Sequence, residues 1–196
     1  MVRRTFSPAR AWRLAVGPAS TRTLGLTETT IVVLLNFAYG SNMLSARLVQ
    51  RVPGAEFVGI GLLRGHVLQW HKVAKDGSGK CDIAVAMDDS FVYGVLYEIP
   101  AHEKKNLDRA EGLGYGYEEK QVSIEMGATT HKATAYYATS IDPSIVPFTW
   151  YKALVVAGAV EHGLPSEYVE NLRASPAKQD PDAEIHAQNM ALAGEA

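Results

Sequence analysis

The sequence contains one cysteine among its 196 residues, which excludes an internal disulfide and any zinc or iron–sulfur site built from several cysteines. It also lacks an apolar run near the roughly 18–20 residues that a membrane-spanning helix needs. Neither sign of charge dominates, because the formal net charge is −2, so no basic field indicates nucleic acid. These absences predict a soluble, cytoplasmic protein from a reducing compartment, with neither a membrane nor a nucleic acid as partner.

Acidic residues are missing from the first 27 positions, which carry five arginines before the first acid, Glu28. An Arg-rich, acid-poor leader is typical of an organelle-targeting peptide; a disordered arm and an over-extended start are the alternatives. We expect residues 1–29 to be a disordered leader and residues 30–173 to form one domain. Residues 174–196, rich in Ala, Pro, Gln and acids, are expected to be a flexible tail.

Predicted strands outnumber predicted helices. Runs bounded by Gly, Pro or Asp and Ser predict strands at residues 31–38, 55–63, 66–73, 81–87, 91–98, 117–126 and 130–139. Helical spacing predicts helices at 43–51, 102–111, 147–162 and 166–173. The first strand, Ile31–Ala38, is almost wholly apolar and is expected to be buried on both faces. This order predicts an α+β fold with a small, mixed, strongly curved or barrel-like sheet and a few packed helices.

The strongest chemical signal lies in the segment Phe37–Leu44, where a glycine and two small polar residues stand between a strand and a helix. Backbone N–H groups there lack helical partners and have the helix dipole behind them, which favours a carboxylate or a developing oxyanion. Gly40 lets a ligand approach the backbone closely, and Ser41 or Asn42 can cap the helix and also contact the ligand. A capped helix start without a ligand is the alternative.

A second signal is Glu111, which ends the predicted helix 102–111 just before Gly112. The negative end of the helix dipole disfavours an anion there, which suits a group that accepts a proton and later returns it. A solvated glutamate at a helix end is the alternative from position alone. Asp108 lies one turn earlier, but it also lies four residues after Lys104 and can pair with it.

Other candidates are weaker. Asp76–Lys80 resembles a phosphate-binding loop, but the first glycine of that motif is missing and Cys81 replaces its Ser or Thr, so the motif fails. Cys81 is expected to be a buried core residue rather than a nucleophile. Tyr136 is a pocket candidate, although burial with a backbone partner explains it as well. The same two interpretations stay open for Tyr115 and Tyr117.

Three sequence blocks together resemble the γ-glutamylcyclotransferase superfamily, in its AIG2-like group. The first block is Phe37–Leu44, and the second is Leu107–Gly112, with the pattern Leu-Asp-x-x-Glu-Gly. The third runs from Tyr151 to Tyr168 and includes Gly158-Ala159 and the run from His162 to Pro165. The likeness extends from about residue 31 to about residue 172, so the leader and the tail lie outside it.

The resemblance implies a nearly barrel-like sheet with a pocket at the loop that follows the first strand. It also implies cleavage of a γ-glutamyl amide without water, in which the α-amino group attacks the γ-carbonyl and releases 5-oxoproline with a free amine or amino acid. Glu111 would accept and donate the proton. The substrate contacts would come from Tyr39, Gly40, Ser41, Asn42 and Tyr151, and from the adjoining backbone of Phe37 and Ala38. The expected partner is a small γ-glutamyl molecule, and neither a metal nor another cofactor is required.

Three functions stay open from the sequence. The first is a γ-glutamyl cyclotransferase acting on γ-glutamyl amino acids or amines. The second is a related enzyme acting on a γ-glutamyl isopeptide or a biosynthetic intermediate. The third is a non-catalytic small-molecule-binding protein on the same scaffold. Glu111 favours an enzyme, because a binding protein does not need a protonatable carboxylate at that position.

Overall fold

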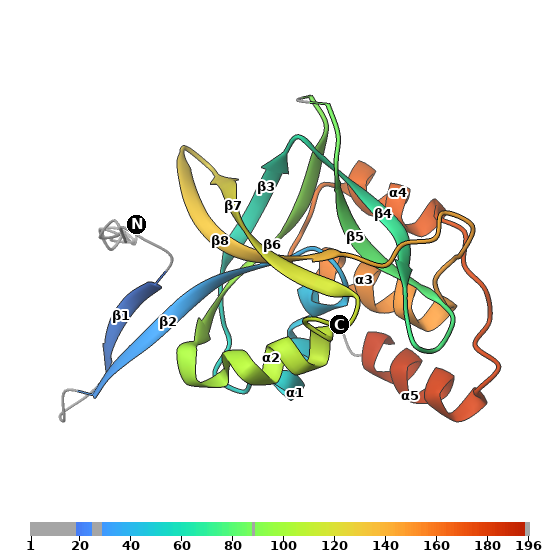
Figure 1. Cartoon of the computed structure of the whole chain (residues 1–196), viewed down its shortest axis with the longest axis horizontal. Coiled ribbons are helices and arrows are strands. Elements are labelled where there is room, and N and C mark those ends of the chain that lie inside the picture. Colours follow the sequence, from blue (N-terminus) through green and yellow to red (C-terminus); the bar gives the residue numbers. More distant parts are fainter. Residues whose placement is uncertain (1–18, 25–28, 88, 195–196) are drawn as a thin grey trace, which may run out of the picture.

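The computed structural model describes residues 19–24, 29–87 and 89–194, and its centre is a small closed sheet (Figure 1). The strand order is β1-β2-β6-β3-β7-β8, and β2 also pairs with β8, which closes five strands into a barrel. The strands are β1 (Ala19–Leu24), β2 (Thr29–Ala38), β3 (Glu56–Arg64), β6 (Phe91–Pro100), β7 (Tyr117–Met126) and β8 (Thr129–Ala138). The predicted α+β fold with a barrel-like sheet is confirmed.

The two halves of β2 pair with different strands, because only its last part belongs to the closed barrel. Its last part pairs in parallel with β8 at Asn36 and Thr134, and antiparallel with β6. Its first part instead pairs with β1, which lies beside the barrel (Figure 1). The prediction that β2 is buried on both faces therefore holds only near its end: Phe37 is 1% exposed, whereas Val32 is 44% exposed.

The remaining elements surround one end of the barrel. A separate hairpin consists of β4 (His66–Val73) and β5 (Gly79–Val85). The helices are α1 (Ser45–Arg51), α2 (Lys104–Glu111), α3 (Thr149–Glu161), α4 (Ser166–Ala174) and α5 (Ala183–Gly194), with short 3₁₀ turns η1 (Ser41–Met43) and η2 (Ala101–Glu103). Figure 1 shows α1 and α2 below the barrel and α3 to α5 on the side opposite β1. No helix of the described ranges is long and apolar enough to cross a membrane.

The predicted elements are present with small shifts at their ends, and one of them is interrupted. The helix expected from Met43 to Arg51 is divided into η1 and α1, because Leu44 between them has an extended backbone with φ −68° and ψ 115°. The C-terminal stops are as expected: Gly112 adopts the left-handed conformation after α2, and Gly163 does so after α3.

Parts of the two segments that flank the predicted domain form regular elements. The segment predicted to be a flexible tail contains α5, which packs against α3. Asp182 caps this helix by accepting the N–H groups of Glu184 and Ile185, and Trp150 Nε1 donates to the buried Asp180 at 2.6 Å. The amino-acid composition of residues 174–196 does not reveal this cap. In the predicted disordered leader, residues 19–24 form β1, and residues 1–18 and 25–28 lie outside the described residues.

Candidate active site

A narrow pocket opens at the end of the barrel where β2 runs into η1. Every residue that was predicted from the sequence to contact the substrate lines this pocket, and Glu111 lines it as well. The lining consists of Asn36, Phe37, Ala38, Tyr39, Gly40, Ser41, Asn42, Cys81, Glu111, Tyr117, Tyr136 and Tyr151. These side chains come from β2, η1, β5, α2, β7, β8 and α3, so the fold brings seven elements to one place.

The segment that follows β2 at this pocket is a 3₁₀ turn rather than the start of a long helix. Met43 N donates to Gly40 O at 2.9 Å, and this is the first bond of the turn. The N–H groups of Ser41 and Asn42 precede that bond, so the described turn offers them no acceptor. A helix was expected to start directly behind these N–H groups, but α1 begins only at Ser45, after the 3₁₀ turn and the extended Leu44.

Glu111 is hydrogen-bonded to the 3₁₀ turn η1. It is the last residue of α2, and its Oε1 accepts a hydrogen bond from Asn42 Nδ2 at 2.5 Å. Arg51 Nη1 lies 3.0 Å from the same oxygen and 2.6 Å from Asn42 Oδ1. The three side chains form a closed triangle in which two donors stabilise the carboxylate and fix its direction. The Glu111 carboxylate is therefore oriented by contacts with both η1 and α1.

Arg51 was not among the predicted site residues. It ends α1, nine residues after Asn42, and its side chain is 22% exposed against 17% for Glu111. Cationic side chains are common in the last turn of a helix. The sequence position of Arg51 therefore did not distinguish it from a solvent-exposed arginine. The ion pair links α1 to α2.

Three of the tyrosines that line the pocket are deeply buried. Burial raises the pKa values of Tyr39, Tyr117 and Tyr151 well above the ordinary range, so all three stay protonated. Tyr39 Oη donates to Tyr136 O and Tyr117 Oη donates to Cys81 O, each at 2.5 Å. Tyr151 Oη accepts the Cys81 N–H at 3.2 Å.

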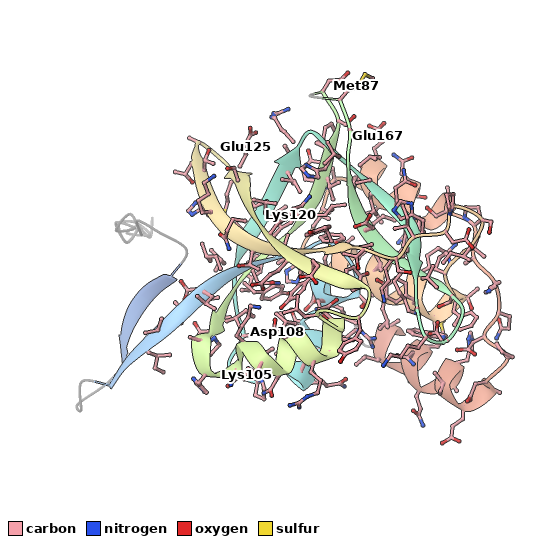
Figure 2. The ribbon with its side chains drawn as sticks, in the orientation of Figure 1. Met87, Lys105, Asp108, Lys120, Glu125 and Glu167 are labelled. Atoms are coloured by element: carbon pink, nitrogen blue, oxygen red, sulfur yellow. The ribbon has the colours of Figure 1, made fainter. Side chains whose placement is uncertain are left out.

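Tyr136 lines the pocket, but its hydroxyl has no backbone partner of the expected kind. It donates to Asp108 Oδ1 at 2.6 Å, and Lys104 pairs with the same carboxylate. The alternative of a Lys104–Asp108 ion pair is therefore confirmed. Figure 2 shows Asp108 on the barrel side of α2. Tyr115, by contrast, is 83% exposed and does not line this pocket.

Asn36 is a second residue that the sequence analysis missed. It lies one position before the recognised block, is 4% exposed and lines the pocket. Its Oδ1 is buried without a hydrogen-bond partner among the described residues. An unpaired buried acceptor costs roughly 1–3 kcal/mol, so this oxygen is a buried polar atom beside the pocket that the described residues leave unsatisfied.

The described residues contain no candidate metal site. Within residues 19–24, 29–87 and 89–194, no group of three or more His, Cys, Asp or Glu side chains is arranged to hold an ion. The titratable groups in the described lining of the pocket are Glu111, the Cys81 thiol and four tyrosine hydroxyls.

The family follows from comparison with known proteins. A model of the AIG2-like family matches residues 91–172. The γ-glutamylcyclotransferase of Homo sapiens is 31% identical over 149 residues, covering 71% of this chain and 77% of the human protein; that of Bos taurus is 30% identical with the same coverage. A solved structure named γ-glutamyl cyclotransferase has a TM-score of 0.76 at 26% identity and covers 84% of this chain and 99% of its own.

This chain belongs to the γ-glutamylcyclotransferase family. It is a cyclotransferase enzyme, which confirms the resemblance stated from the three sequence blocks. A human protein described as uncharacterized gives a further solved structure with a TM-score of 0.72 at 27% identity, over 81% of this chain and 98% of that one. The alternative of a non-catalytic binding protein is thereby disfavoured.

Cys81 in this cyclotransferase is expected to be inert toward alkylation. Burial raises the pKa of its thiol to about 12, so only about one thiol in 10⁴ is ionised at pH 8. Iodoacetamide should label the folded protein at least about 100-fold more slowly than the urea-unfolded protein, as measured by mass spectrometry. Equal rates in the two states would contradict the buried, protonated thiol.

Alanine at Gly40 is expected to impair substrate binding more than stability. The φ of −115° is open to any residue, so no backbone strain arises. The new Cβ would lie 3.1 Å from Tyr151 Oη and 3.2 Å from Cys81 Cβ, which narrows the pocket. We expect KM to rise about tenfold, equivalent to about 1.4 kcal/mol, with a loss of less than about 1 kcal/mol in unfolding free energy. Steady-state kinetics and thermal unfolding measure both.

The matched control is Gly194→Ala, because a Cβ at Gly194 meets no atom within 4 Å. That variant should change neither KM nor the melting temperature. If Gly40→Ala instead lowered stability as much as binding, Gly40 would be a purely structural residue.

Proposed function

We propose that this cyclotransferase releases 5-oxoproline and a free amine or amino acid from a small γ-glutamyl amide by intramolecular attack. The supporting observation is the position of Glu111, which lines both the narrow pocket and a wider cavity outside it. A single carboxylate between two compartments can serve a nucleophile in one and a leaving group in the other.

The narrow pocket suits the glutamyl end of the substrate. The N–H groups of Ser41 and Asn42 can bind its α-carboxylate or the oxyanion that forms at the γ-carbon. The buried Oδ1 of Asn36 can accept a hydrogen bond from the α-amino group. Tyr151, beside Gly40, can donate its hydroxyl proton to the bound glutamyl group.

The proton transfers balance without water. Glu111 takes one proton from the α-ammonium, and the freed nitrogen attacks the γ-carbonyl carbon to form a tetrahedral oxyanion. Glu111 returns that proton to the leaving nitrogen as its bond to the γ-carbon breaks, which releases a neutral amine. The ring nitrogen still carries one extra proton, which it gives to Glu111, and Glu111 passes it to the departing amine. Two protons in all thus move from the α-nitrogen to the leaving nitrogen. Ring closure is intramolecular, so holding the chain folded supplies much of the rate enhancement and no nucleophilic side chain is needed.

The test is incubation of the purified chain with γ-glutamyl-alanine, followed by separate assays for 5-oxoproline and glutamate. We expect 5-oxoproline and alanine in equal amounts. Glutamate in place of 5-oxoproline would show hydrolysis and contradict the cyclisation. Heat-inactivated protein corrects for spontaneous ring closure of the substrate.

A further inference from the structure

The wider cavity outside the narrow pocket is strongly cationic. It has a volume of about 260 Å³ and shares Ser41, Glu111, Tyr117 and Tyr151 with the narrow pocket. Glu111 is the one carboxylate in its described lining. Six cationic side chains line it: Arg47, Arg51, Lys72, Lys75, Lys80 and Arg109. Since the whole chain carries a formal charge of −2, this concentration is not a consequence of composition.

Four of these six cations lack an ion-pair partner among the described residues. Arg51 pairs with Glu111, and Lys80 pairs with Asp76 at 2.9 Å. The other four cations (Arg47, Lys72, Lys75 and Arg109) make no ion pair with any carboxylate among the described residues. Within the described part of the chain, the cavity therefore has more positive charge than its ion pairs neutralise.

The inner cations are also partly removed from water. Lys72 is 8% exposed, and its Nζ lies 4.6 Å from the centre of the Tyr117 ring. Among the described residues, Arg47 donates to two neutral groups, Ser41 Oγ and Asn189 Oδ1. Burial, together with the nearby charge of Arg51, lowers its pKa to about 10. Keeping such cations together costs free energy unless an anion enters.

We propose that the cavity binds a leaving group that carries at least two negative charges, as carboxylates or a phosphate. This inference rests on the proposed function and names the substrate class for it. The leaving amine takes its proton from Glu111 at the inner end of the cavity, so the rest of the leaving group extends among the unpaired cations. A single carboxylate, as on alanine, would leave most of these cations without a partner.

The experiment compares substrates of equal size and different charge. γ-Glutamyl-aspartate and γ-glutamyl-asparagine differ by one charge in nearly the same volume, and γ-glutamyl-phosphoethanolamine supplies its charge as a phosphate. At low ionic strength we expect kcat/KM for the aspartate substrate to exceed that for the asparagine substrate at least about tenfold. Addition of 0.5 M NaCl, a concentration at which the Debye length is only about 4–5 Å, should reduce this ratio. Similar kcat/KM values for the two substrates at low salt would overturn the inference.

The phosphate substrate distinguishes the two sources of charge. A kcat/KM for γ-glutamyl-phosphoethanolamine above that of the aspartate substrate would assign the cavity to a phosphate. The reverse order would assign it to two carboxylates. Either order supports the inference only if the kcat/KM of the charged substrate exceeds that of γ-glutamyl-asparagine.

Charge-removing variants locate the effect. Lys72→Gln, and separately the double variant Lys75→Gln with Arg109→Gln, should each shrink the aspartate-to-asparagine ratio several-fold. The double variant changes two exposed residues, so it remains informative if Lys72→Gln fails to fold. Lys105→Gln is the control, because Lys105 lies on the side of α2 away from the barrel (Figure 2). An equal effect of Lys105→Gln would show a non-specific field and overturn the assignment to the cavity.

Failure of this inference is distinguishable from failure of the proposed function. If no γ-glutamyl substrate yields 5-oxoproline, the proposed function fails. The cavity is then tested by calorimetric titration with free aspartate and free asparagine as probes. Tighter binding of aspartate supports an anion site, and equal binding overturns it.

Discussion

Replacing Glu111 by glutamine is expected to preserve the fold and to lower kcat by about 10²–10⁴-fold, the range of a general acid–base group. Glutamine has nearly the same shape, and its carbonyl oxygen can still accept from Asn42 and Arg51, which both contact Oε1 in the parent protein. The amide cannot take a proton from the α-ammonium or return one to the leaving amine. The measurements are 5-oxoproline release under saturating substrate and thermal unfolding.

Thermal unfolding should show only a small loss, because the Arg51–Glu111 pair is partly exposed and exposed pairs contribute at most about 1 kcal/mol. Glu118→Gln is the matched control, since Glu118 is exposed on β7. It should retain full activity. A Glu111→Gln variant with activity within about twofold of the parent would exclude this carboxylate as the proton-transfer group.

The fold class was predictable because its evidence is local. Alternating runs and turn residues gave β7 at Tyr117–Met126 without error, and Gly112 marked the end of α2. Closure of the barrel was visible only as a tendency, since the pairing of Asn36 with Thr134 joins positions far apart in the chain. The interruption at Leu44 and the cap at Asp182 depend on single side chains and backbone angles that periodicity does not report.

The candidate pocket was predictable where its residues are adjacent in the sequence. Phe37–Asn42 and the motif around Glu111 were each visible as a block, and the structure places both in one pocket. Asn36 was missed because an asparagine near the end of a strand carries no signal until its Oδ1 is seen to lack a partner. The cationic cavity was missed for a similar reason. Its lysines and arginines come from α1, the β4–β5 hairpin and α2, and each looks like a solvated charge when taken alone.

Alanine at Gly158 is expected to destabilise the protein and to displace the turn that carries Asn42. Gly158 lies in α3, where its missing side chain lets the backbone of η1 and Leu44 approach the helix. A Cβ there would lie 2.3 Å from Leu44 N and 2.6 Å from Met43 C, so one of the two backbones must move. Alanine gains up to about 1 kcal/mol in helix propensity, but overpacking typically costs about 1–3 kcal/mol and more against backbone. The net loss should be about 1–3 kcal/mol in unfolding free energy.

Activity should fall further than stability explains. Movement of the turn separates Asn42 from Glu111, which are joined at 2.5 Å, and shifts of about 1 Å can cost about 10²-fold in rate. We therefore expect kcat of Gly158→Ala to drop at least about tenfold at a temperature where the variant remains folded. Val160→Ala is the control on the same helix, because Val160 is 47% exposed and should tolerate the change. A stable and fully active Gly158→Ala variant would show that contact with α3 does not position the turn, and Asn42 would then have to be held by Arg51 and Glu111 alone.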